Sequence, residues 1–241
     1  MGNPILILGE SGTGKSTSIR NLNPKETYLL CCVEKELPFR AWRKNYIEKE
    51  GGNFAINDNA SAICKLINNI SVHRQDIKNL IIDDFQYVMS NEYMRRAKEG
   101  GFGKFNDIGL YVFNIINEAV SSRQDLNILF LSHSCKDKDG ISKLKTVGNI
   151  IDDKVSFEGR FTIILHTFID ITQKDSDKYK FITQNNGFLM AKSPMGMFED
   201  TFIPNDLQCA IEKINDYYKY DEEVIDEWIR KIYKWKLYKC T

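Results

Sequence analysis

The hydrophobic pattern alternates between short, continuously apolar runs and longer stretches with helical periodicity. Runs such as Leu80–Ile82 and Ile128–Leu131 have no polar interruption, which is typical of strands covered on both faces of a sheet. This alternation predicts an α/β fold with a mostly parallel sheet. The strands are expected near Ile5–Leu8, Thr27–Val33, Asn79–Asp83, Asn127–Ser132 and Phe161–Ile171.

Helical spacing is clearest between the last two predicted strands. Its apolar stripe consists of Ile108, Tyr111, Val112, Ile115, Ile116 and Ala119. Past the fifth strand, Asp175–Asp177 and Asn186–Gly187 look like hairpin turns and predict an antiparallel extension. A helix start resembling a capping box follows at Asn205. We therefore expect an α/β domain over residues 1–204 and a helical C-terminal tail over residues 205–241.

The first predicted strand runs directly into Gly9–Ser16, which matches the complete phosphate-binding pattern G-x-x-x-x-G-K-[ST]. Glycines let the backbone wrap around phosphates, so that successive N–H groups face the anion. Lys15 is expected to reach the β- and γ-phosphates of a nucleotide, and Ser16 to bind Mg²⁺ through its hydroxyl. The sequence thus predicts ATP and Mg²⁺ as cofactors. The residues expected to bind the nucleotide are Gly9, Glu10, Ser11, Gly12, Thr13, Gly14, Lys15, Ser16 and Thr17.

Acidic and polar residues at the ends of later strands complete the predicted site. Asp83 ends a buried strand and is expected to hold Mg²⁺ together with Ser16. Two carboxylates compete to activate water. Glu34, after the second strand, is preferred, and Asp84 is the alternative, one methylene shorter than the glutamate many ATPases have there. His133 follows the fourth strand and is expected to contact the γ-phosphate.

The composition restricts the partners. Lys and Arg together number 33, as do Asp and Glu, so no overall field favours nucleic acid or membranes and any nucleic-acid contact must be local. The six cysteines show no zinc-ligand spacing and are expected to be reduced thiols. No apolar run approaches bilayer length. We therefore expect a cytoplasmic protein without a membrane partner.

In their order along the chain, these motifs resemble the RecA-like ATPases, and most closely the small phage-encoded AAA-type ATP-binding proteins. The resemblance spans roughly residues 4–204. It implies a RecA-like P-loop core, a homo-oligomer, a place in phage DNA recombination or replication with protein partners there, and the host cytoplasm as location. Some relatives act as single-strand annealing or recombination ATPases. Beyond the site motifs, it is carried by Phe102–Ile108, Leu129–Ser134, Gly148–Lys154 and Gly159–Leu165.

The resemblance also implies roles for basic residues. Lys192 matches a basic residue that acts on the nucleotide of a neighbouring subunit, although the second basic position of that pattern is Pro194, and Arg160 is a second candidate. The loops Asn91–Phe105 and Cys135–Gly148 match loops that bind single-stranded DNA, for which lysines and arginines between aromatic residues are suited. The basic residues of these loops are Arg95, Arg96, Lys98, Lys104, Lys136, Lys138, Lys143 and Lys145.

The sequence is also compatible with other functions. The chain could be a helicase loader or another AAA+ remodeller acting on a protein partner, although its C-terminal helices carry no obvious lid motif. Thr172–Asp175 loosely mimics a guanine-selecting motif, but Asp83–Gln86 lacks the D-x-x-G that accompanies it in GTPases. A protein that holds ATP without turnover is a further possibility. The basic, aromatic stretch Lys231–Lys239 could bind DNA or a partner, or pack as a last helix.

Overall fold

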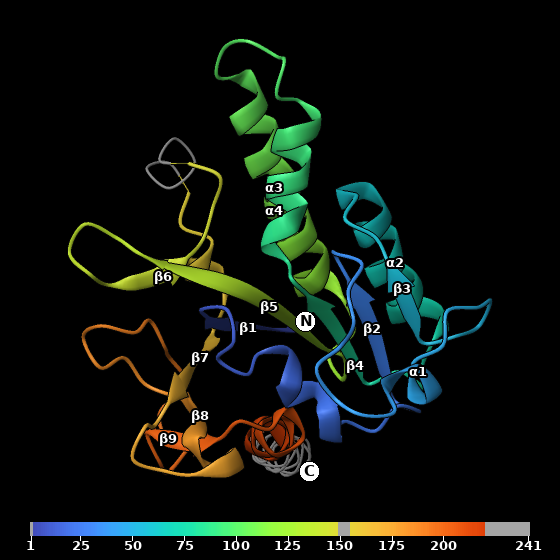
Figure 1. The fold of residues 1–241 in the computed structure, drawn as a ribbon. Helices are drawn as coiled ribbons and strands as arrows, with labels where there is room; N and C mark the ends of the chain where they lie inside the picture. Colours follow the sequence, from blue (N-terminus) through green and yellow to red (C-terminus); the bar gives the residue numbers. More distant parts are fainter. Residues whose placement is uncertain (1, 149–154, 220–241) are drawn as a thin grey trace, which may run out of the picture.

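A computed structural model describes residues 2–148 and 155–219 of the chain (Figure 1). Within these residues nine strands form a mostly parallel sheet, in the spatial order β3-β2-β4-β5-β1-β7-β8-β9, with β6 paired to β5 off this path. The strands are β1 (Asn3–Gly9), β2 (Thr27–Cys31), β3 (Phe54–Ile56), β4 (Asn79–Asp83), β5 (Asn127–Lys136), β6 (Ser142–Leu144), β7 (Ile163–Ile169), β8 (Tyr179–Ile182) and β9 (Phe202–Pro204).

The central strands have the order of a RecA-like sheet. β5 lies between β1 and β4, so the strand that leads into the phosphate-binding loop is separated from the strand that ends in Asp83. Ile5 of β1 stands in parallel register with Leu129 of β5 and with Ile163 of β7. Beyond β7 the sheet continues antiparallel through β8 and β9. The predicted fold class, a parallel core with an antiparallel extension, is confirmed.

Helices cover both faces of this sheet. Because neighbouring residues of a strand point to opposite faces, Leu6 and Leu8 pack into one core and Ile5 and Ile7 into the other. The first core is closed by α2 (Ala60–His73), α3 (Gln86–Arg95) and α4 (Gly103–Ser121). The second is closed by the 3₁₀ helix η1 (Ser16–Asn21), by α1 (Trp42–Asn45) and by a helix over residues 207–219.

Two strands end at other residues than predicted, because a strand continues only as far as a neighbouring strand pairs with it. β4 has the predicted bounds, but β2 ends at Cys31, two residues before the predicted end. β5 runs on to Lys136 because β6 pairs antiparallel with its end. The phosphate-binding loop is followed by a single short 3₁₀ segment, η1.

Two predicted connections take other forms. β7 and β8 do form a hairpin, joined by a segment that includes η3 (Asp175–Lys178). Asn186–Gly187 does not close a second hairpin, because β8 pairs with β9 instead. There, the Asn186 side chain accepts hydrogen bonds from the next backbone N–H groups, those of Phe188 and Leu189, within a loop.

The segment 91–105 was predicted to be a loop that binds DNA. The prediction of a loop is wrong, because both ends of the segment are helical. Residues 91–95 belong to α3, and α4 begins at Gly103, so only residues 96–102 connect the two helices. The helices form an antiparallel pair whose far end projects away from the sheet (Figure 1). Tyr93 and Phe105 pack against each other between them, with ring centroids 5.7 Å apart.

The predicted C-terminal tail is described only as far as residue 219. Its first helix is confirmed over residues 207–219, and Leu207, Ile211 and Ile214 are buried against the sheet. The division of the chain at residue 204 stays a prediction. The rest of the predicted tail, with the stretch Lys231–Lys239, and most of Gly148–Lys154 lie outside the described residues. Among the helices that are described, none combines the length and apolar character needed to cross a membrane.

Candidate nucleotide-binding site

The phosphate-binding loop leaves β1 at Gly9, where the backbone passes close to β7. A Cβ on Gly9 would lie 1.7 Å from the Oγ1 atom of Thr167, so no side chain fits there. Gly14 has a φ of +99°, a conformation that glycine adopts without the steric cost borne by other residues. The two glycines thus serve different purposes, one allowing close packing and the other a tight turn.

Lys15 lies folded over this loop. Its Nζ donates hydrogen bonds to the backbone oxygens of Gly9, at 2.8 Å, and Glu10, at 2.7 Å, and only 6% of the residue is exposed. Burial lowers the pKa of Lys15 to about 8, although the charges of Asp83 and Asp84 oppose the shift. A buried ammonium group beside the loop N–H groups is what binding of a phosphate anion requires.

Ser16 and Asp83 meet at the mouth of the loop. The Ser16 hydroxyl donates to both carboxylate oxygens of Asp83, at 3.0 Å to Oδ1 and 2.8 Å to Oδ2. Asp83 is fully buried, and burial raises the pKa of its carboxyl group, against the opposing charge of Lys35. A hydroxyl and a carboxylate in contact are hard oxygen donors and fit Mg²⁺, which takes few protein ligands besides phosphate oxygens and water. Both predicted metal ligands are therefore brought together.

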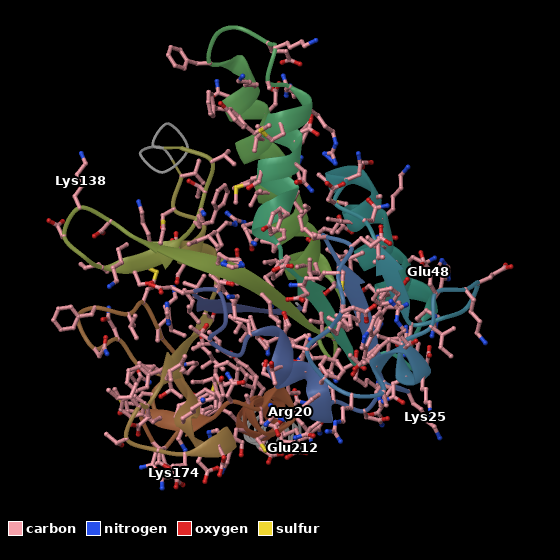
Figure 2. The ribbon with its side chains drawn as sticks, viewed as in Figure 1. Arg20, Lys25, Glu48, Lys138, Lys174 and Glu212 are labelled. Atoms are coloured by element: carbon pink, nitrogen blue, oxygen red, sulfur yellow. The ribbon has the colours of Figure 1, made fainter. Side chains whose placement is uncertain are left out.

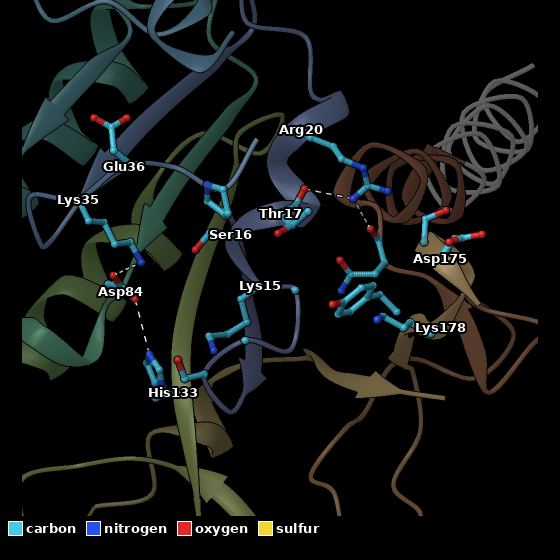
Figure 3. Close-up of a pocket in the computed structure, with 17 residues that line it drawn as sticks. Lys15, Ser16, Thr17, Arg20, Lys35, Glu36, Asp84, His133, Asp175 and Lys178 are labelled. Carbon is cyan, nitrogen blue, oxygen red and sulfur yellow. Dashed lines mark hydrogen bonds and ion pairs between the residues drawn. The ribbon is translucent and has the colours of Figure 1, made fainter. Parts of the chain in front are cut away.

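Lys35, which sequence reasoning missed, enters the same site. Its Nζ forms an ion pair with Asp84 (Figure 3). The same atom lies 3.6 Å from Oδ2 of Asp83. Burial lowers the pKa of Lys35, but the charge of Asp83 and the contact with Asp84 outweigh this and raise it overall. The sequence motifs gave no signal for Lys35, because the direction in which its side chain points depends on where β2 ends.

Asp84 combines burial with an unusual backbone. It is 4% exposed and has a φ of +60°, which for a residue with a side chain is costly and typical of functional positions. One of its oxygens lies 3.8 Å from Nε2 of His133. Burial lowers the pKa of His133, as does the charge of Lys15. The two side chains converge beside Lys35 (Figure 3).

Gln86 holds the end of β5 in place and was also missed by the sequence analysis. Its side-chain oxygen accepts a hydrogen bond from the backbone N–H of His133, at 3.0 Å, and one from the Ser132 hydroxyl, at 3.3 Å. The residue is 5% exposed and lies in the first turn of α3. Gln86 therefore links the strand end that carries His133 to the segment that carries Asp84.

Glu34 and Lys192, two of the predicted catalytic residues, do not reach this pocket. Glu34 is exposed and lies beside Asn57, Asp58 and Tyr87 in a separate shallow depression. The backbone of Lys192 exchanges hydrogen bonds with Ile164 of β7. The structure thus brings Lys15, Asp84 and His133 together and leaves Glu34 and Lys192 apart from them.

Lys15, Lys35, Asp84 and His133 line one cavity of about 600 Å³, a size suited to a small ligand. Its wall runs from Lys35, Asp84 and His133 past the loop to the β7–β8 connection. The lining residues are Ser11, Gly12, Gly14, Lys15, Ser16, Thr17, Arg20, Lys35, Glu36, Pro38, Asp84, His133, Asp175, Ser176, Lys178, Tyr179 and Asn205.

Comparisons with known proteins add little beyond the fold. No protein-family model and no curated protein matches the chain. Among solved structures it is similar to a DnaB-like replicative helicase described with its interactions with primase, at 13% sequence identity and a TM-score of 0.48. The similarity covers 83% of this chain and 58% of the helicase chain, so this chain spans little more than half of that protein. The fold assignment therefore rests on the strand order and the phosphate-binding loop.

Proposed function

We propose that this chain is a Mg²⁺-dependent ATPase of the RecA-like type that acts in phage DNA recombination or replication. The observation that carries the ATPase proposal is the contact between Ser16 and Asp83 beside the buried ammonium of Lys15. These are the three groups that P-loop proteins use to hold a triphosphate and its metal ion. Lys15 and Ser16 belong to the phosphate-binding loop and line the cavity, and Asp83 reaches Ser16 from the end of β4.

The ATPase proposal is tested by replacing Lys15 with alanine. Lys15→Ala removes the cation between the β- and γ-phosphates and is expected to abolish tight ATP binding in calorimetry. Lys25→Ala is the matched control, because Lys25 is exposed and its side chain points into solvent (Figure 2). Equal ATP affinity in both variants would refute the proposal.

For water activation, the geometry favours Asp84 over Glu34. Asp84 is buried, lies in the cavity and approaches His133, whereas Glu34 is exposed and outside it. In this proposal Asp84 accepts the proton of the attacking water, and His133, held by Gln86, orients the reacting group. Mg²⁺, when bound, supplies positive charge to the phosphate oxygens. Glu34 remains the alternative base.

Lys35 is proposed to stabilise negative charge that develops on the γ-phosphate. In the structure its ammonium group neutralises the carboxylates of Asp83 and Asp84. With Ser16 and Asp83 as the residues that would hold Mg²⁺, the Lys35 ammonium would be free to contact phosphate from the cavity wall. A preorganised cation aimed at developing negative charge is among the strongest catalytic devices.

Single-stranded DNA is proposed as a partner, bound on the hairpin formed by β5 and β6. Lys136, Lys138 and Lys145 are exposed there, and Lys138 extends into solvent at the far end (Figure 2). The backbone N–H of Lys145 donates to the carbonyl of His133, at 2.9 Å. This bond joins the hairpin to the nucleotide site, which supports binding that depends on the nucleotide.

The α3–α4 arginines are less suited to DNA than the sequence suggested. Arg95 forms ion pairs with Asp58 and Glu92, and Arg96 pairs with Glu99 and Asp107. Charges that are already compensated attract phosphate weakly. We therefore assign the main DNA contact to the β5–β6 hairpin alone.

A homo-oligomer is proposed because Lys192 lies outside the cavity of its own chain. In an assembly, the lysine of one subunit could complete the site of the next, as the family resemblance implies. Mixing Lys192→Ala subunits with Lys15→Ala subunits tests this. Hydrolysis should return in the mixture, because some interfaces then join an intact Lys192 to an intact Lys15. A monomer that is fully active at working concentration would contradict it.

A protein remodeller is the second candidate, favoured by the apolar end of the α3–α4 pair. Met94 is 67% exposed and Phe102 70% exposed, on a part that projects from the sheet (Figure 1). Exposed apolar residues of this kind suit a protein partner. ATPase activity without any retention of single-stranded DNA would put this candidate first.

A further inference from the structure

The nucleotide pocket has a second end, formed by residues to which the proposed chemistry gives no role. In Figure 3, Asp175 and Lys178 lie on the side opposite Lys35 and Asp84, beyond Thr17. This end of the pocket is formed by η1, by the β7–β8 connection with the first residue of β8, and by the segment that enters the helix over residues 207–219. The lining residues at this end are Arg20, Asp175, Ser176, Lys178, Tyr179 and Asn205.

Asn205 is the unusual member of this group. It is 3% exposed, yet neither its Oδ1 nor its Nδ2 atom has a hydrogen-bond partner among the described residues. Leaving a buried amide unpaired costs free energy. The amide lies against the phosphate-binding loop, because a Cβ on Gly14 would be 2.9 Å from Oδ1 of Asn205.

The fold does not need the Asn205 side chain for its own purposes. Its backbone is fixed by Arg20, which donates to its carbonyl at 2.8 Å, and by its own N–H, which donates to Tyr179 at 3.3 Å. The start of the following helix is capped by Asp206, which accepts from the N–H of Gln208 at 2.9 Å. The sequence predicted a helix cap near Asn205, and in the structure the capping residue is Asp206.

We propose that Asn205 is the residue that selects the base of the nucleotide, and that the base is adenine. The proposal rests on the proposed function: a triphosphate held by Lys15 and Ser16 directs its nucleoside past Thr17 toward this end. A primary amide offers one donor and one acceptor side by side, which matches the amino group and adjacent ring nitrogen of adenine. The ring of Tyr179, in the same wall, provides a face for stacking.

Guanine is the competing ligand at this end, through Asp175. A carboxylate accepts from the ring N–H and the 2-amino group of guanine, and the segment Thr172–Asp175 loosely mimics a guanine-selecting motif. Asp175, however, is exposed, whereas Asn205 is almost completely buried. Selectivity follows the buried group, because the wrong base leaves that group unpaired where water cannot reach it.

The test measures binding of non-hydrolysable analogues of ATP and GTP, and of inorganic tripolyphosphate, by calorimetry with Mg²⁺. The wild-type protein is expected to bind the ATP analogue about ten- to a hundredfold more tightly than the GTP analogue, the usual range for one bidentate base contact. Asn205→Leu should remove this preference and leave tripolyphosphate affinity unchanged. Asn205→Asp replaces the donor by an acceptor and should reverse the preference toward GTP.

Two further variants keep the outcome unambiguous. Asn114→Asp makes the same chemical change at an exposed position of α4 and should retain the wild-type preference. Asp175→Asn should also retain it; a shift in this variant, equal affinities in the wild-type protein, or an unchanged preference in both Asn205 variants would overturn the proposal. If tripolyphosphate and both analogues fail to bind the wild-type protein, the proposed function itself fails.

Discussion

Ser16 and Asp83 are 67 residues apart in the chain, and their side chains are joined by a hydrogen bond of 2.8 Å. The contact exists because β4 delivers Asp83 to the same edge of the sheet at which β1 releases the phosphate-binding loop. Asp83 is fully buried there, so its charge needs a partner. This pair defines where a metal ion would bind and is the basis of the first prediction.

Replacing either member of this pair should separate nucleotide binding from its metal dependence. Ser16→Ala and Asp83→Asn remove one oxygen ligand each, so Mg²⁺ is expected to strengthen ATP binding much less than in the wild-type protein. Calorimetry with and without Mg²⁺ measures the effect. Thr17→Ala changes the neighbouring hydroxyl, whereas it is the Ser16 hydroxyl that donates to Asp83, and should keep the response to Mg²⁺. Equal Mg²⁺ dependence in all three variants would contradict the metal site.

The two candidate bases are separated by isosteric substitution. Asp84→Asn should bind ATP and hydrolyse it at least about a hundredfold more slowly, the usual scale for loss of a general base. Glu34→Gln should hydrolyse ATP at close to the wild-type rate, because Glu34 lies outside the cavity. Single-turnover kinetics provide the comparison. The reverse result would restore Glu34 as the base and assign a structural role to Asp84.

Removing the Lys35 cation should destabilise the fold and make its stability respond to Mg²⁺. Lys35→Ala leaves the carboxylates of Asp83 and Asp84 without their cation, and is expected to destabilise the fold by about 1–3 kcal/mol. This is less than for a fully buried pair, since the Lys35 side chain is 35% exposed and partly screened. Urea unfolding measures the loss, and added Mg²⁺ should restore part of it. Lys35→Arg keeps the charge and is the control; a loss of equal size there would point to packing.

Gly9 should tolerate no side chain. A Cβ there would meet Thr167, a β-branched residue that is 3% exposed and has little room to move. Gly9→Ala is therefore expected to cost about 1–3 kcal/mol. Gly100→Ala is the control, because nothing lies within 4 Å of a Cβ at that position, and its effect should stay within about 0.5 kcal/mol. Chemical denaturation compares them, and equal stability would contradict the tight passage beside β7.

DNA binding should depend on the β5–β6 hairpin and not on α3. A variant with Lys136, Lys138 and Lys145 changed to glutamine is expected to lose most retention of single-stranded DNA at low salt, because these exposed lysines would neutralise phosphates. Changing Arg95 and Arg96 to glutamine should have a smaller effect, since both are paired within the chain. Gel shifts with a non-hydrolysable ATP analogue measure both variants. A larger loss from the arginine variant would return the DNA contact to α3.

Much of the fold and part of the site could be predicted from the sequence. β4 has the predicted bounds, and Ser16 and Asp83 meet as expected. These predictions succeeded because each depends on a contiguous local pattern: an apolar run that ends in an acid, or glycines at fixed spacing before a lysine. The turn near Asp175 was found for the same reason.

The sequence by itself determined the phosphate-binding loop, the alternation of strands and helices, and the acid that faces the loop. The tertiary structure decided which charges share the cavity. Because β2 ends at Cys31, Lys35 turns toward Asp84 and Glu34 stays outside. Long-range packing likewise buries the Asn205 amide against the loop. No local pattern encodes these outcomes, since each depends on where a strand ends and on what distant segment lies beside it.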